Sequence, residues 1–269
     1  MDFISYSRVF INQREIKKIL NIMLPAMVQG KGRNSIVLRA PSGYGKTFLT
    51  KIIISWLFVY HEIKTTWLPV TETVPEINVK SQIIVCDEAH TIKNIEMFYP
   101  FIDSKENFFI FMTNEYNQLK EPLLNRSLVL DFEEYKNDSL VQIIENVGLS
   151  FDIVIPHEDA IMILDYTKKY PRSVERVAEK FCIFVNEFGY PVNDIKKTML
   201  FLGFTEGGFS KNDIKYLDFL KITETASLST LSKALNMPKQ YIEQEIEPFL
   251  LKNKLINITS KGRKYAEKN

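Results

Sequence analysis

The segment APSGYGKT, residues 40–47, has the residue types and spacing of a phosphate-binding loop. It fits the Walker A pattern with Ala40 in place of the first glycine. Gly43 and Gly45 allow a tight turn that points backbone N–H groups inward. Lys46 supplies a positive charge for the β- and γ-phosphates, and Thr47 supplies a hydroxyl for Mg²⁺. We therefore predict an ATP and Mg²⁺ site lined by Ala40, Pro41, Ser42, Gly43, Tyr44, Gly45, Lys46, Thr47 and Phe48.

Two carboxylates follow an apolar run farther along the chain, in IIVCDEAH at residues 83–90. A buried strand would deliver Asp87 and Glu88 to the edge of a sheet, where one can hold Mg²⁺ and the other can take a proton from the attacking water. An acidic pair is more often a solvated turn. A buried strand in a chain with a phosphate loop favours the catalytic alternative, with Asp87 as metal ligand and Glu88 as general base.

The apolar run FFIFMTNE, residues 108–115, ends in Thr113 and Asn114, whose polar groups could orient the same water. Arg126 lies twelve residues beyond Asn114. An arginine at the edge of the sheet can reach a nucleotide on a neighbouring subunit and stabilise transition-state charge. The alternative is a solvated surface arginine, or one paired with Glu121.

Arg172, in YPRSVERV at residues 170–177, follows a proline that suits the first turn of a helix. From that position it could contact the γ-phosphate. The alternative is an exposed arginine that shares a helix surface with Arg176.

The elements that must position these residues alternate along the first half of the chain. Helices are predicted at 14–28 and 46–58, and strands at 35–40, 81–86 and 107–113. This alternation is typical of a parallel sheet flanked by helices, an α/β fold, which we assign to residues 1–135.

The remaining sequence changes character. Residues 136–204 contain helical blocks at 138–148, 157–170, 173–188 and 192–203 and no convincing strand, which predicts a helical lid domain. Residues 205–269 contain three helices, at 211–222, 227–236 and 238–253, and then an extended basic end. We predict a winged helix in which Lys261, Arg263 and Lys264 contact DNA. A solvated basic tail is the alternative.

Composition sets broader limits. The 269 residues carry 34 Lys and Arg against 33 Asp and Glu, so no overall charge directs the chain to nucleic acid or lipid. The charge is uneven, because residues 71–160 hold 17 acidic and 6 basic residues, whereas residues 252–269 hold 6 basic and 1 acidic. Any DNA binding is therefore expected at the C-terminal end.

The sequence also bears on location. The N-terminus has no charged segment followed by an apolar one, and no apolar stretch reaches the roughly 18 residues that cross a bilayer. We expect a cytoplasmic protein with no membrane segment, whose Cys86 and Cys182 are reduced, buried thiols. The abundance of Lys, Ile and Asn suggests an AT-rich genome, such as that of a phage or plasmid.

In this order, the Walker A loop, the carboxylate pair, Asn114, Arg126 and Arg172 resemble the AAA+ ATPases. The RuvB branch-migration ATPases are the most similar family. FINQREIKKIL near the N-terminus resembles their FIGQ box, EPLLNRSLVLDFEEY resembles their arginine-finger segment, and YPRSVERV resembles their lid motif. The stretch IEPFLLKNKLINITSKGRKY is similar to their winged helix. The resemblance spans nearly the whole chain.

The resemblance implies roles residue by residue. Phe10, Ile11, Tyr135 and Pro171 would surround the adenine. Asn114 would be a sensor, Arg126 a finger acting on the neighbouring subunit, Arg172 a lid sensor, and Lys261 and Arg263 part of a DNA-contacting wing. It further implies a homo-oligomer, as a ring or partial ring, that works on branched or double-stranded DNA.

The sequence also departs from the family. Residues 68–80 are too short for the usual helix, and the segment after DEAH leaves no room for the β-hairpin that engages a junction-binding partner. Asn12 replaces the glycine of the box, and Leu124 replaces an arginine. These losses bear on partner coupling and translocation and leave ATP binding unaffected.

Three functions are compatible with these features. The first is a compact RuvB-like ATPase that remodels or translocates DNA. The second is a loader, similar to clamp and helicase loaders, that recruits a replication or recombination protein to DNA, and the shortened core favours it somewhat. The third is an ATP-gated DNA-binding regulator.

Overall fold

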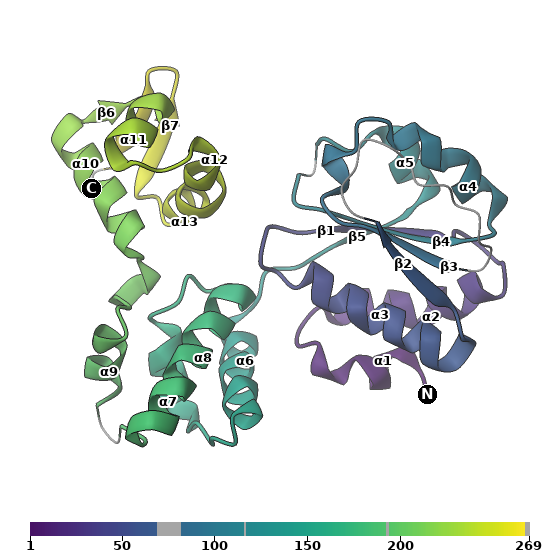
Figure 1. The fold of residues 1–269 in the computed structure, drawn as a ribbon, viewed down its shortest axis with the longest axis horizontal. Helices are drawn as coiled ribbons and strands as arrows, with labels where there is room; N and C mark the ends of the chain where they lie inside the picture. Colours follow the sequence, from purple (N-terminus) through teal and green to yellow (C-terminus); the bar gives the residue numbers. More distant parts are fainter. Residues whose placement is uncertain (69–81, 116, 192–193, 267–269) are drawn as a thin grey trace. The chain divides into compact units, whose positions relative to one another are not determined.

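The computed structural model, which describes residues 1–68, 82–115, 117–191 and 194–266, has a parallel sheet where the alternating pattern predicts one (Figure 1). The strands lie in the order β2-β3-β4-β1-β5, and every neighbouring pair is parallel. β5 was not predicted, because this strand is only four residues long and polar residues flank it. The strands are β1 (Ser35–Arg39), β2 (Lys64–Leu68), β3 (Gln82–Cys86), β4 (Phe108–Thr113) and β5 (Leu128–Asp131).

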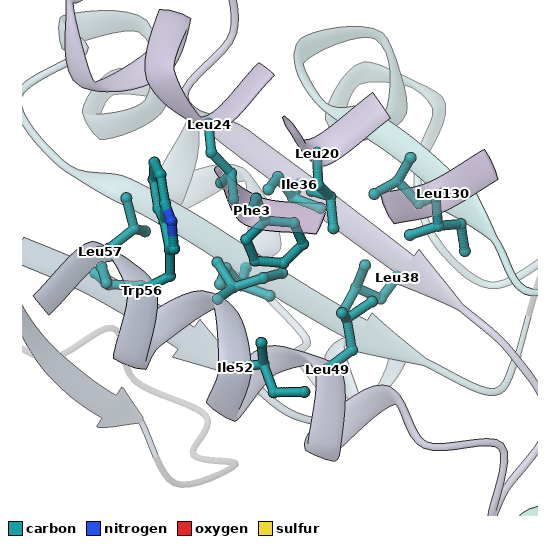
Figure 2. Packing of buried hydrophobic residues seen from close by; sticks show 14 of the residues in the cluster. Phe3, Leu20, Leu24, Ile36, Leu38, Leu49, Ile52, Trp56, Leu57 and Leu130 are labelled. Atoms are coloured by element: carbon teal, nitrogen blue, oxygen red, sulfur yellow. The ribbon is translucent and has the colours of Figure 1, made fainter. Parts of the chain in front are cut away.

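Helices cover both faces of this sheet (Figure 1). One face carries α1 (Phe3–Tyr6), α2 (Arg14–Val28) and α3 (Lys46–His61), and the other carries α4 (Tyr99–Ser104) and α5 (Glu121–Arg126). Because successive side chains of a strand point to opposite faces, Ile36 and Leu38 pack in one layer and Val37 packs in the other. Figure 2 shows the first layer, in which Phe3 lies among side chains from the sheet and helices.

The parallel arrangement brings the carboxyl ends of the strands to one edge. β1 leads into the phosphate loop, β3 leads to Asp87, and β4 leads to Asn114. The backbone N–H of Ala40 donates to the carbonyl of Thr113 at 3.2 Å, which joins the loop to the end of β4. This edge holds most of the predicted catalytic residues.

The structure divides into two compact units. The first comprises Met1–Ile143 and Tyr170–Arg172, and the second comprises Ile144–Lys169 and Ser173–Asn269. The predicted boundary between residues 204 and 205 lies within the second unit, and the three-domain division stays a prediction.

The helical region contains α6 (Asn137–Ser150), α7 (His157–Leu164), α8 (Pro171–Phe188) and α9 (Ile195–Phe201). The helix predicted over 157–170 ends at Leu164, so its last part was wrong. Lys169 has a left-handed φ of 55°, and Pro171 disfavours a helical conformation at the residue before it. The segment between α7 and α8 is therefore a connection rather than helix.

The C-terminal part has the predicted winged-helix elements. They are α10 (Lys211–Thr223), α11 (Leu228–Leu235), α12 (Lys239–Tyr241) with a π-helical turn (Ile242–Ile246) and α13 (Glu247–Lys252), followed by β7 (Ile256–Thr259) and β8 (Gly262–Tyr265). The π turn precedes Pro248, which has no N–H to continue the α-helical ladder. A short strand that was not predicted, β6 (Thr225–Ala226), pairs with β8.

Candidate functional site

The phosphate loop has the geometry that its glycines predict. Gly43 and Gly45 have φ angles of 79° and 91°, in the region that favours glycine. A Cβ at Gly43 would lie 2.9 Å from the ring of Tyr170, and one at Gly45 would lie 3.1 Å from the ring of Phe10. Both positions need glycine for conformation and for space.

Lys46 begins α3 and is 7% exposed. Its ammonium donates to the carbonyl oxygens of Ala40 at 2.6 Å and Pro41 at 3.1 Å. Burial lowers the pKa of Lys46, the charges of Glu88 and Asp87 oppose that shift, and Arg172 adds to it. Four of the predicted site residues therefore lie within electrostatic reach of one another.

The ends of β3 and β4 contribute oxygen atoms. Within the described parts of the chain, the buried Oε2 of Glu88 and Oδ1 of Asn114 have no hydrogen-bond partner. Buried acceptors are normally hydrogen-bonded, so two orphans beside a phosphate loop indicate a site built for a further donor such as water. Mg²⁺ prefers oxygen ligands, and the hydroxyl of Thr47 with the carboxylate of Asp87 fits that preference.

Aromatic and polar side chains from distant segments surround the loop. Phe10 is buried, its ring centroid lies 5.9 Å from that of Phe48, and the hydroxyl of Tyr135 donates to the carbonyl of Tyr44 at 3.2 Å. Burial raises the pKa of Tyr135, which keeps its phenol neutral. Phe10 and Tyr135, two of the four residues predicted around adenine, thus meet at the loop.

Gln13 was not predicted to matter, although it lies in the quoted FINQ box. It is fully buried, its Nε2 donates to the carbonyl of Glu133 at 2.7 Å, and its Oε1 accepts from the Glu133 N–H at 2.8 Å. This pair of bonds fixes the box against the segment that carries Tyr135. Asn12 has a φ of 64°, so asparagine occupies a left-handed position that glycine would also suit.

The backbone of Arg172 lies beside the phosphate loop, and the predicted contact of its side chain with the γ-phosphate stays a prediction. Its backbone N–H donates to the carbonyl of Gly43 at 3.1 Å. The preceding Tyr170, which was not predicted, stacks on Tyr44 with a centroid distance of 6.4 Å and an interplanar angle of 11°. The start of α8 therefore closes one side of the phosphate loop.

Arg126 contacts two side chains of α4. Its Nε donates to both carboxylate oxygens of Asp103, at 3.0 and 3.2 Å, and its guanidinium lies 4.8 Å from the ring centroid of Tyr99. The predicted alternative partner was Glu121, and Asp103 occupies that role instead.

The wing residues differ from one another. Lys261 and Lys264 are exposed. Arg263 donates to both carboxylate oxygens of Glu247, at 2.8 and 3.2 Å, and the hydroxyl of Tyr216 donates to Glu247 at 2.9 Å. The structure thus gives Arg263 an internal role that ties β8 to α13, and its predicted contact with DNA stays a prediction.

We expect Glu247→Gln to destabilise the winged helix. The side chains of Glu247 and Arg263 are 4% and 16% exposed, and removing one partner of a buried pair costs about 3–5 kcal/mol. Hydrogen exchange at the β8 amides of the full chain should show a free energy of opening that is lower by about 3–5 kcal/mol. Asp218→Asn, which breaks the exposed pair with Lys221 in the same unit, should leave the exchange unchanged. Equal exchange in both variants would contradict the structural role of the pair.

Comparison with known proteins gives a consistent result. The model of the RuvB C-terminal winged helix domain matches residues 206–269. The RuvB subunit of the Holliday junction branch migration complex from Campylobacter lari is 30% identical, over 94% of this chain and 85% of that protein. The chain belongs to the RuvB family. Its counterpart from Mycoplasmopsis pulmonis is 29% identical, over 96% of this chain and 93% of that protein.

Solved RuvB structures have the same fold. The Thermotoga maritima RuvB Holliday junction branch migration motor is 24% identical, with a TM-score of 0.79 over 96% of this chain and 93% of that one. The α/β AAA+ fold with a C-terminal winged helix is therefore confirmed for this RuvB-family chain. The relatives named here are bacterial, and they give no support to the phage or plasmid origin suggested by composition.

The departures from the RuvB family can be partly located. Residues 87–107, all described, contain short helices and no strand, which agrees with the predicted lack of a β-hairpin. The shortened segment at residues 68–80 lies almost wholly outside the described residues.

Within the described ranges, no helix is both long and apolar enough to span a membrane, and the two cysteines are buried and unpaired, as predicted.

Proposed function

We propose that this chain hydrolyses ATP at sites completed by a neighbouring subunit, and uses the energy to remodel or translocate DNA. The observation that supports this most directly is the convergence of Lys46, Asp87, Glu88 and Asn114 at the carboxyl edge of one parallel sheet. The family relationship supports the DNA part, because the relatives named above are subunits of a Holliday junction branch migration complex.

Each residue has a physical task in this proposal. Lys46 binds the β- and γ-phosphates, and Thr47 and Asp87 hold Mg²⁺, which would neutralise phosphate charge. Glu88 accepts the proton of the attacking water, and Asn114 orients that water. Arg172 acts from the same chain, and Arg126 acts on the neighbouring subunit, where its charge stabilises the transition state.

We propose Phe10, Ile11, Tyr135 and Pro171 as the adenine pocket. Phe10 and Tyr135 support this placement, because both contact the phosphate loop and an apolar, aromatic surface suits a base.

The wing supplies the DNA contact in this proposal. Lys261 and Lys264 are the exposed cations at the hairpin, whereas the helix before it carries Glu243 and Glu245, which repel phosphate.

The double variant Lys261→Ala with Lys264→Ala is expected to weaken DNA binding at low salt. Each lost phosphate contact reduces the slope of log K against log salt by about 0.9, so the slope should become shallower by about 1.8. Fluorescence anisotropy with a labelled duplex at several salt concentrations measures it. Lys215→Ala, which removes an exposed lysine of α10, should leave the slope unchanged. An unchanged slope in the double variant would mean that these wing lysines do not contact DNA phosphates.

The function is tested with a synthetic four-way junction whose arms are homologous. The protein alone, with ATP and Mg²⁺, should convert the junction to two duplexes, and a non-hydrolysable analogue should not support the conversion. Hydrolysis without any movement of the junction would contradict the remodelling function.

A loader function is the second candidate, and the absence of strands from residues 87–107 favours it. A loader needs an ATP-dependent switch and a docking surface more than a motor loop. ATP-dependent recruitment of a replication or recombination protein to DNA, with no conversion of the junction, would support this candidate over the first.

A further inference from the structure

His90 lies two residues after Glu88, the predicted general base, and the sequence pattern predicted no role for it. It lies in a short 3₁₀ turn after β3 (Ala89–Thr91), and its side chain is 12% exposed. Its Nδ1 lies 3.1 Å from Oγ1 of Thr113 and 3.4 Å from Oε2 of Glu88. One ring nitrogen therefore faces the end of β4 and the carboxylate at the end of β3.

The Glu88 oxygen that His90 faces is the one that lacks a hydrogen-bond partner. Glu88 Oε2 is buried, and Nδ1 of His90 lies 3.4 Å from it. Glu88 also has a left-handed φ of 47°, and its carbonyl accepts from the N–H and hydroxyl of Thr91 at 2.9 and 2.8 Å. The backbone at Glu88 is fixed, so the direction of its carboxylate depends on what lies beside it.

The hydrogen bonds of Thr113 indicate which ring nitrogen of His90 carries the hydrogen. Thr113 Oγ1 accepts from the N–H of Glu115 at 3.0 Å and lies 3.3 Å from the Glu115 carbonyl, to which it can donate its single hydrogen. The oxygen can then only accept from His90, which requires the hydrogen on Nδ1. A hydrogen on Nδ1 would face two oxygens, Oγ1 of Thr113 on β4 and Oε2 of Glu88 just beyond β3.

We propose that His90 is a positioning residue that uses this Nδ1–H to hold the Glu88 carboxylate in place and to tie it to the end of β4. Asn114 directly follows the last residue of β4, and the Thr113 carbonyl accepts from the N–H of Ala40 in the phosphate loop at 3.2 Å. His90 thus connects the base to the strand of the sensor. The inference rests on the proposed role of Glu88 in ATP hydrolysis.

The chemistry of the side chain gives a test by substitution. The Nδ2 of asparagine, like Nδ1 of histidine, is attached to Cγ, so asparagine can place a hydrogen near the same point. Glutamine places its donor one bond farther out, and alanine has none. We expect His90→Ala and His90→Gln to lower kcat by about 10- to 100-fold through a displaced base, with ATP affinity and the thermal unfolding midpoint unchanged. His90→Asn should keep most of the wild-type kcat.

Two further measurements separate positioning from stability. In a Glu88→Gln background, His90→Ala should have no added effect on turnover, because the group that it positions has been replaced. Equal losses of kcat and ATP affinity in all three His90 variants, or wild-type kcat in His90→Ala, would overturn the proposal.

A structure of His90→Ala tests the inference without relying on turnover. We expect the Glu88 carboxylate to leave its position. An unmoved carboxylate would overturn the positioning role. Failure of the wild-type chain to hydrolyse ATP would instead overturn the proposed function.

Discussion

Glu88→Gln is expected to bind ATP with wild-type affinity and to lower turnover by about 100-fold or more, the contribution of a positioned general base. Glutamine keeps the size and most hydrogen bonding of glutamate but cannot accept a proton from water. In the proposed site, Lys46, Thr47 and the loop glycines bind ATP, and the substitution leaves them intact. A fluorescent ATP analogue measures binding, and phosphate release measures turnover.

The matched control for this variant is Glu62→Gln. Like Glu88, Glu62 has a left-handed φ, here 56°. It is the exposed residue that follows α3. It should retain full turnover. Full turnover by Glu88→Gln would remove Glu88 from the catalytic assignment, and loss of ATP binding would mean that its role is structural.

Arg126→Ala is expected to lower turnover by about 10³- to 10⁵-fold, the usual effect of an arginine that acts on the transition state. In the described chain the guanidinium pairs with Asp103 and Tyr99 of α4, and its proposed target is the nucleotide of a neighbouring subunit. The substitution should leave ATP binding to the same chain intact.

Mixing experiments separate action on a neighbour from action within the chain. Arg126→Ala has an intact phosphate loop, and Lys46→Ala has an intact finger, so a mixture of the two should regain part of the turnover that each lacks alone. Arg8→Ala, an exposed arginine of the same unit, is the control and should be fully active. No recovery in mixed assemblies would contradict action between subunits.

The local patterns predicted a large part of the fold. A Walker A loop requires a strand before it and a helix after it, and β1 and α3 lie there. Apolar runs marked β3 and β4 because both strands are buried on two faces. The helix over 14–28 was predicted with its observed bounds because its apolar periodicity is strong.

The features that sequence did not predict depend on partners far along the chain. Arg263 meets Glu247 only after β8 folds back, and Gln13 meets Glu133 across 120 residues. His90 is visible in the sequence as part of DEAH, but its proximity to Thr113 follows from the pairing of β3 with β4. Local pattern identifies which residues can do chemistry, and only the assembled sheet shows which side chains they meet.

The proposed function depends on Arg126 of one subunit completing the ATP site of the next. Electron microscopy of Glu88→Gln with ATP, Mg²⁺ and a four-way junction tests it most directly, because this variant should hold its nucleotide. We expect a ring or partial ring in which the Arg126 guanidinium has left Asp103 and contacts the γ-phosphate bound by the adjacent subunit. Subunits that bind ATP while every Arg126 stays on its own Asp103 would contradict it.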